Sequence, residues 1–317
     1  MTATAARAAA TREAFGPTLI RLAEAGYDIV TLEADLSAST GGRQLKAAFP
    51  ERWYTVGASE ANMISMAAGL AADGKTVFAA SFAVFVPGHC FDQVRMSVAQ
   101  PGLNVKLVAS HGGVSVGEDG ASAQAIEDLS LVTALPGMTV VVPADVVEAA
   151  QAIWAAGTTA GPFYIRLGRP KVPMVYGDEY RFALGRAHRL REGGDATVIA
   201  CGHLVAAARE AAERLAAGGV SVRVLNMATI TPLDEEAVIS AARETGAIVT
   251  AEEHLVQGGL GAAVTRALAA TYPAPVEQVG VRDRYGESGR WDQLLERFGL
   301  DAGGVEAAVQ RVLQRKN

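Results

Sequence analysis

Cysteine is nearly absent from this sequence. Cys90 and Cys201 are the only two in 317 residues, and they lie in separate halves of the chain without a CxxC spacing. This pattern argues against a disulfide framework and against a structural zinc site, and it fits a reducing compartment.

Basic clusters and long apolar runs are also missing. The net charge is −6, and no stripe of basic residues interleaved with aromatics occurs, so nucleic acid is not an expected partner. The most apolar run, Val77 to Val86, is interrupted by Ser81 and is far shorter than the ~20 residues that a membrane helix needs. Residues 1–10 lack the apolar core of a secretory signal. We therefore expect a cytoplasmic protein that contacts no membrane.

The chain does contain a regular alternation of strand-like and helix-like segments. In the first half the expected strands are 28–32, 75–80, 105–109, 139–142 and 163–166, and the expected helices are 11–25, 59–72, 89–99, 126–135 and 145–156. In the second half the expected strands are 196–200, 222–225, 248–251 and 276–279, and the expected helices are 204–217, 234–244, 260–270 and 305–314. Short runs rich in valine and isoleucine between helices predict an α/β fold with mostly parallel sheets covered by helices.

A break between two domains is predicted where regular structure becomes difficult. Two prolines and two glycines lie between Gly168 and Asp178, and these residues interrupt helices and strands. We predict a first domain over residues 1–170, a linker over 171–190 and a smaller second domain over 191–317.

Four loops of the first domain follow predicted strands or open a predicted helix, and ligands of open parallel sheets bind beyond the carboxyl ends of strands. The first loop, from Ala34 to Gly42, has glycines and hydroxyls suited to an anion, although an ordinary capping loop has the same composition. The others are the loop before Glu60, the Ser81–His89 segment with two phenylalanines, and the Ser110–Ser122 segment with a histidine, two acids and four glycines.

Glu60 is the most informative single residue. No charged residue occurs between Asn62 and Ala72, so this carboxyl stands alone at the start of an apolar helix. A carboxyl in such a position suits proton transfer. Stabilisation of the helix by an acid at its N-terminus is the simpler alternative.

Taken together, the ordered motifs resemble the C-terminal half of transketolases over nearly the whole chain. In the first domain the motifs are Thr11–Gly16, Ala34-Asp35-Leu36, Ser59-Glu60-Ala61-Asn62, Ser81-Phe82, Ser110-His111 and Gly117-Glu118-Asp119-Gly120. In the second they are Ala251–His254, Gly258–Gly261 and Asp283–Gly289. The resemblance implies a pyrimidine-binding domain followed by a transketolase C-terminal domain.

The resemblance also implies a cofactor, thiamine diphosphate. Glu60 matches the catalytic glutamate that hydrogen-bonds the aminopyrimidine ring, and Asp35 matches a position near the cofactor. Phe82 and Phe85 match residues that pack on the pyrimidine, and which of them stacks on it stays open. The cofactor carries out the carbanion chemistry, while the protein positions it.

The substrate side is implied in the same way. Ser39 matches a position near the substrate, and His111 and Asp119 match positions that contact its phosphate and hydroxyl groups. His111 also counts among the implied catalytic residues. Arg169 matches the phosphate-binding arginine, with Arg166 as the alternative. The implied reaction is transfer of a two-carbon ketol unit from a ketose to an aldehyde.

The metal and diphosphate half of the site is missing from the sequence. Family members hold Mg²⁺ and the diphosphate with a Gly-Asp-Gly run and a later asparagine; the nearest approach here, Gly194-Asp195-Ala196 with Asn226, ends in alanine and lies in the second domain. The resemblance therefore implies that a separate N-terminal transketolase subunit supplies these groups, including the Mg²⁺ ligands, in an α2β2 heterotetramer.

One residue departs from the family pattern. Ala123 stands where many members have a histidine that touches the donor, so an unusual substrate is expected. Two alternatives remain open: the β subunit of a 2-oxo-acid dehydrogenase first component, and a non-catalytic scaffold subunit.

Overall fold

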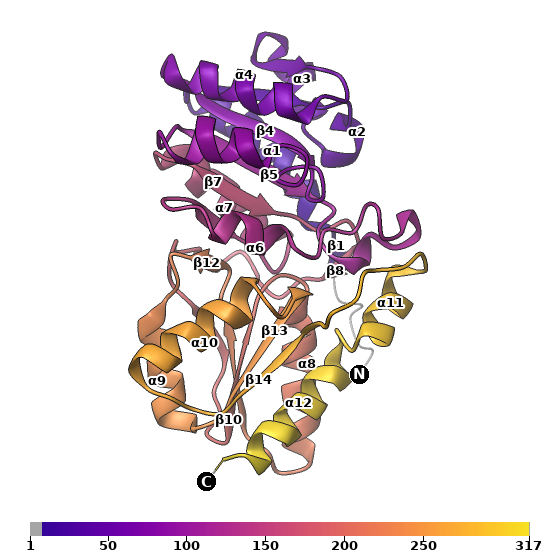
Figure 1. The fold of residues 1–317 in the computed structure, drawn as a ribbon, viewed down its shortest axis with the longest axis vertical. Helices are drawn as coiled ribbons and strands as arrows, with labels where there is room; N and C mark the ends of the chain where they lie inside the picture. Colours follow the sequence, from indigo (N-terminus) through magenta and orange to yellow (C-terminus); the bar gives the residue numbers. More distant parts are fainter. Residues whose placement is uncertain (1–7, 317) are drawn as a thin grey trace.

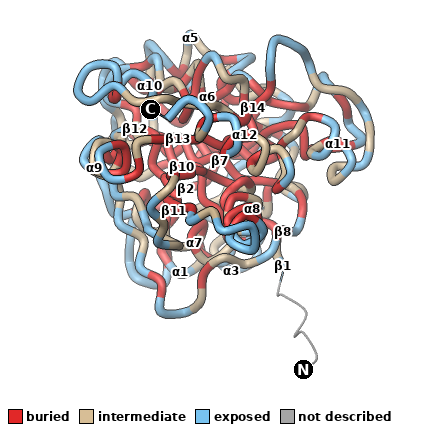
Figure 2. The backbone as a smooth tube through the Cα atoms, turned by 90° about the horizontal axis from the view of Figure 1, so that it is seen from below, coloured by how far each residue is buried: buried red, intermediate tan, exposed pale blue. Residues whose placement is uncertain are grey.

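The computed structural model describes residues 8–316 and arranges them in two α/β units, stacked along the long axis of the molecule (Figure 1). Residues 1–7, which belong to the first predicted domain and to the segment judged not to be a secretory signal, lie outside the described part, as does residue 317. In the tube view, buried backbone runs through the centre of the molecule, and the exposed segments lie mostly at its periphery (Figure 2).

The first unit is built on a seven-stranded sheet in the order β12-β6-β7-β5-β4-β2-β3. Its strands are β2 (Ile29–Glu33), β3 (Trp53–Thr55), β4 (Thr76–Phe82), β5 (Val105–Ser110), β6 (Thr139–Val141), β7 (Phe163–Arg166) and β12 (Thr229–Thr231). All neighbours pair in parallel except β12, which is antiparallel to β6. The predicted parallel sheet is confirmed.

Helices cover both faces of this sheet. Along the chain they are α1 (Phe15–Glu24), α2 (Ser37–Thr40), α3 (Arg43–Ala48), α4 (Glu60–Ala72), α5 (Phe91–Gln93), α6 (Asp128–Thr133) and α7 (Val146–Thr158). Shorter helical turns span Thr11–Ala14, Pro50–Arg52, Val94–Ala99 and Val114–Asp119. Residues of α1, α3 and α7 share one buried cluster with the sheet, whereas those of α4 and α6 share another.

The second unit has a five-stranded sheet in the order β14-β13-β10-β11-β9. Its strands are β9 (His188–Arg191), β10 (Ala196–Ala200), β11 (Val222–Asn226), β13 (Ile248–Leu255) and β14 (Val276–Val281), and its helices are α8 (Leu204–Ala217), α9 (Glu235–Thr245), α10 (Gly259–Thr271), α11 (Trp291–Phe298) and α12 (Ala302–Gln314). Only β9 runs antiparallel to its neighbour.

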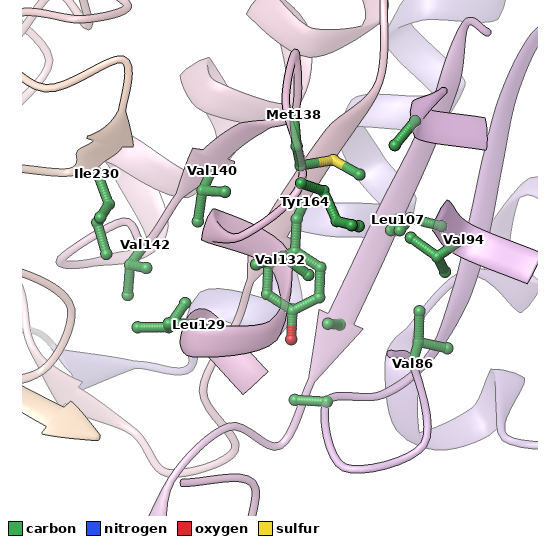
Figure 3. Packing of buried hydrophobic residues seen from close by; sticks show 14 of the residues in the cluster. Val86, Val94, Leu107, Leu129, Val132, Met138, Val140, Val142, Tyr164 and Ile230 are labelled. Atoms are coloured by element: carbon green, nitrogen blue, oxygen red, sulfur yellow. The ribbon is translucent and has the colours of Figure 1, made fainter. Parts of the chain in front are cut away.

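The two units share one apolar core. The buried cluster that contains Leu129, Val140 and Ile230 of the first sheet continues into Ile199, Val238 and Leu260 of the second unit. Figure 3 shows Ile230 facing Val140 and Val142 in this cluster, with Tyr164 at its centre. Burial of apolar surface across the boundary therefore fixes the units against each other.

The segment between the units is packed rather than loose. Its strand β8 (Val172–Pro173) pairs with β1 (Ala8–Ala9), and the rings of Tyr176 and Tyr180 stack with centroids 3.6 Å apart. Tyr180 donates a hydrogen bond to the buried carboxylate of Glu148 at 2.5 Å.

Several elements were not expected from the sequence. They are the short α2 and α3, the eight-residue α11, the edge strands β3 and β9, and β12, which lies beyond the predicted boundary but completes the first sheet. None of the helices in residues 8–316 is long and apolar enough to cross a membrane.

Candidate active site

The predicted loops meet at one edge of the first sheet. Strands β2, β4 and β5 are in register there, with Glu33 opposite Ala80 and Phe82 opposite Ser110. Because these strands are parallel, the residues that follow them emerge at the same edge.

Glu60 is the first residue of α4 and is half-buried. Its Oε1 accepts a hydrogen bond of 3.1 Å from the hydroxyl of Ser81, at the end of β4. Within residues 8–316 its second carboxylate oxygen has no hydrogen-bond partner. The carboxyl is thus oriented by the neighbouring strand while one oxygen stays available to a ligand.

Aromatic rings form a continuous stack beside this carboxyl. The ring of His111 lies 3.8 Å from that of Phe82, the Phe82 and Phe85 centroids are 5.9 Å apart, and Phe85 lies 5.0 Å from His89. All neighbouring planes are within 22° of parallel. Phe82 and Phe85 are both half-buried members of this stack, and such a row of parallel rings suits packing against a further flat ring.

Two guanidinium groups lie near His111. The side chain of Arg12 donates to the carbonyl oxygen of Ser39, and that of Arg169 donates to the carbonyl oxygen of Val116 and to Glu118. Burial, together with the charges of Arg12 and Arg169, lowers the pKa of His111 to about 3. His111 is therefore a neutral hydrogen-bonding group near neutral pH, and the two arginines supply the positive charge.

The remaining predicted residues are less tightly placed. Asp35 and Asp119 are both exposed, and within residues 8–316 neither side chain forms a hydrogen bond. Asp35 adopts a left-handed backbone conformation with φ of 63°. Ser39 is half-buried and is tied to Arg12 through its backbone oxygen.

Arg166, the alternative to Arg169, is part of the core. It is buried and binds both carboxylate oxygens of Asp128, at 2.9 and 3.2 Å, and the carbonyl oxygen of Glu253. Its hydrogen-bonding groups are engaged between the two domains, whereas Arg169 is half-buried beside His111.

Sequence reasoning missed Arg12 and Glu33. Arg12 lies before the first strand of the seven-stranded sheet and therefore follows none of its strand ends. Folding brings the helical turn that carries Arg12 beside Ser39. Glu33 ends β2, where Thr40 donates to its carboxylate at 3.0 Å. Burial raises the pKa of Glu33 to about 8, although the Thr40 hydroxyl acts in the opposite direction. Glu33 lies among buried apolar neighbours in the sequence, and this local pattern does not predict a functional role for its carboxyl.

The smaller domain shapes the loop that carries His111 and Asp119. Gln124 donates from Nε2 to the carbonyl oxygens of Val114 and Glu287, both at 3.0 Å. A Cβ atom placed on Gly120 would lie 2.4 Å from the Ser288 hydroxyl. The segment Asp283–Gly289 of the smaller domain therefore packs directly on the loop.

We predict that Gln124→Leu loosens this loop. The buried carbonyl of Val114 and the partly buried carbonyl of Glu287 lose their donor, a change that costs about 1–3 kcal/mol, so amide hydrogen exchange between residues 117 and 123 should speed up by roughly 5- to 150-fold. The exposed Gln100, whose side chain forms no hydrogen bond within residues 8–316, provides the control variant Gln100→Leu. Equal protection in both variants would refute the bracing role.

Asp195 and Asn226, which come closest to the family's metal-binding pattern in the sequence, lie apart in the structure. Asp195 lies before β10 and accepts a hydrogen bond from the amide of Ser221 at 2.7 Å. Asn226 lies at the opposite end of the same strand pair, paired with Ala200, and is bound to Glu148. The two residues therefore do not share a ligand site.

At the start of α10, around Gly258–Gly261, backbone amides bind a carboxylate of the protein itself. The amides of Leu260 and Gly261 donate to Glu252 at 2.8 and 2.6 Å, so tight packing, not an external anion, accounts for these glycines. His203 and His254 are both largely buried at the domain boundary, where they lie 3.5 Å from Glu253 and 4.0 Å from Asp128.

Comparison with known proteins connects both domains to one family. The chain matches the family described as transketolase, pyrimidine binding domain over residues 7–174, and transketolase, C-terminal domain over residues 185–305. It is 44% identical over 96% of its length to a 6-deoxy-6-sulfo-D-fructose transketolase subunit of Clostridium sp. (strain MSTE9), of which it covers 95%. It is 39% identical, over 96% of both chains, to a putative transketolase C-terminal section of Methanocaldococcus jannaschii.

Solved structures and longer relatives give the same result. A structure described as a split gene transketolase, inactive beta4 tetramer, is similar with a TM-score of 0.89 and 46% identity, over 97% of this chain and 99% of that one. Transketolase-like protein 2 of Mus musculus is 37% identical over 96% of this chain, which spans only 49% of the mouse protein.

Proposed function

Because the chain belongs to the transketolase family, we propose that it is the C-terminal subunit of a two-chain transketolase. In this proposal the complex transfers a two-carbon ketol unit from a ketose donor to an aldehyde acceptor. One observation carries it: the chain aligns end to end with separate transketolase subunits, yet spans about half of the mouse transketolase-like protein.

The site offers groups that fit the aminopyrimidine end of thiamine diphosphate. Phe82 and Phe85 present rings in a parallel stack, and one carboxylate oxygen of Glu60 has no partner among residues 8–316. When bound, thiamine diphosphate supplies the carbanion chemistry of ketol transfer. Glu60 would hold a proton and exchange it with the ring nitrogen, Phe82 and Phe85 would orient the ring, and Asp35 borders the site. The partner subunit supplies the Mg²⁺ ligands and the diphosphate contacts.

The other end of the site suits a donor with an anionic terminus. Arg12 and Arg169 supply fixed positive charge, and charge-assisted hydrogen bonds from guanidinium groups are strong and directional. Neutral His111 donates one hydrogen bond without adding charge. Ser39 and Asp119 border the site and suit hydroxyl groups of the sugar.

Ala123 supports an unusual donor or acceptor. It is half-buried in the loop that Gln124 anchors, and its methyl group has no hydrogen-bonding capacity. We expect the enzyme to prefer a substrate that occupies the space beside Ala123, or that makes no contact there, over a substrate that requires a hydrogen bond with an imidazole at this position.

A reconstituted complex tests this proposal. With the partner subunit, ketoses should support turnover and 2-oxo acids should not, with xylulose 5-phosphate and ribose 5-phosphate as poor substrates. Because one restored hydrogen bond is worth about 1 kcal/mol or more, Ala123→His should raise kcat/KM for xylulose 5-phosphate by roughly 5- to 10-fold. Ordinary kinetics of the unmodified complex on this pair would contradict the substrate proposal, and turnover of 2-oxo acids alone would contradict the reaction.

The two alternatives are less well supported. Relatives named as transketolase subunits favour ketol transfer over 2-oxo-acid oxidation. A scaffold subunit would have no need of an oriented Glu60 beside an aromatic stack. We propose an α2β2 heterotetramer, in which the partner covers the exposed side of α4, where Met66 is 42% exposed.

A further inference from the structure

A hollow of about 310 Å³ lies on the smaller domain, apart from the sheet edge that carries Glu60. Its walls are β14, the end of α11, and α12, which lie next to one another in the C-terminal part of the chain (Figure 1). We call it the basic pocket, and its lining residues used below are Gln278, Arg282, Arg284, Phe298 and Arg311.

All charged side chains that line the basic pocket are positive. Three arginines line it and no aspartate or glutamate does, although the chain as a whole carries a net charge of −6. Among residues 8–316, Arg282 and Arg284 form no ion pair. Arg311 pairs with Glu277, but Arg315 binds the same carboxylate, so the surroundings remain positive.

Each of these exposed guanidinium groups makes at least one contact with the protein. Arg282 donates to the carbonyl oxygen of Gln278 at 2.9 Å, and Arg284 donates to that of Arg297 at 3.1 Å while lying 3.7 Å from the ring of Phe298. Arg311 donates through Nε to Glu277. Their other N–H groups have no partner within residues 8–316, so several donors remain for a ligand.

We propose that the basic pocket binds a small phosphate-bearing anion with at least two negative charges. Guanidinium groups match phosphate oxygens geometrically, and three of them around one hollow favour a multivalent ion over chloride. This site is independent of the proposed catalytic function, because no residue lining it belongs to the active site.

Calorimetric titration of the full chain with inorganic pyrophosphate, at constant ionic strength and without Mg²⁺, tests the proposal. Arg169→Gln, which removes one of the two arginines that supply positive charge at the active site, should retain saturable binding. Arg282→Gln combined with Arg284→Gln in the same background should weaken it at least tenfold. Arg266→Gln, an exposed arginine of α10 without an ion pair in residues 8–316, should leave it unchanged.

Three results would overturn the proposal. They are a lack of saturable binding in the Arg169→Gln background, binding that survives the double substitution, and an equal loss with Arg266→Gln. None of these results bears on ketol transfer, so the basic pocket and the active site are tested separately.

Discussion

Replacing Glu60 with glutamine should lower kcat of the reconstituted complex by about 10²- to 10⁴-fold, the range expected for loss of a proton-transfer group. The amide keeps the shape of the side chain and still accepts the Ser81 hydrogen bond seen at 3.1 Å, but it cannot exchange a proton with the cofactor ring. Steady-state kinetics at saturating cofactor measures this effect.

Folding should survive this change, because Glu60 is only half-buried and forms a single hydrogen bond within residues 8–316. Asp73→Asn, at the exposed C-terminal end of the same helix, is the matched control and should keep normal kcat. Unchanged turnover of Glu60→Gln would remove Glu60 from the mechanism and revive the scaffold alternative.

Replacing Arg169 with glutamine should lower kcat/KM for an anionic ketose by roughly 10- to 150-fold. The reason is the loss of one charge-assisted hydrogen bond, worth about 1.5–3 kcal/mol. An uncharged ketose of the same chain length should lose less than threefold, because it makes no such contact. Arg290→Gln, whose guanidinium is exposed and paired with Asp292 at 2.6 Å, is the matched control.

The pH dependence gives an independent check on the same contact. Because the pKa of His111 is lowered to about 3, this ring takes up a proton only in strong acid. KM for an anionic ketose whose own charge does not change between pH 5.5 and 8, such as a sulfonate, should therefore stay flat over this range. A KM that rises through pH 6–7 would show that charged His111, not Arg12 and Arg169, binds the anion. Equal losses for charged and uncharged ketoses would likewise contradict the role of Arg169.

The sequence predicted the parts of the fold that depend on local pattern. The α8 helix and the β7 and β10 strands begin and end where the apolar periodicity places them. The α8 helix lies between His203 and Gly218, β7 follows Pro162 and β10 follows Asp195. The edge strand β9 was missed because it contains His188, Arg189 and Arg191 and has no apolar alternation. The strand β12 was missed because its pairing with β6 depends on a contact distant in the sequence.

The residues of the candidate active site show the same contrast between what the local sequence predicts and what depends on contacts distant in the sequence. Residues at or just after strand ends, such as Phe82 and His111, could be predicted from the sequence because parallel strands end at one edge of a sheet. Arg12 was not, because its place beside Ser39 follows from how the first helical turn packs. The Arg166–Arg169 ambiguity could not be resolved from the sequence, since both lie near the end of β7 and only burial separates them.

The central claim is that this chain forms half of a cofactor site. Titration of thiamine diphosphate with Mg²⁺ into the isolated chain, into the isolated N-terminal subunit and into their equimolar mixture tests it directly. We predict saturable, Mg²⁺-dependent binding of high affinity in the mixture and none of comparable strength in the isolated chain. Tight, stoichiometric, Mg²⁺-dependent binding by this chain alone would contradict the account.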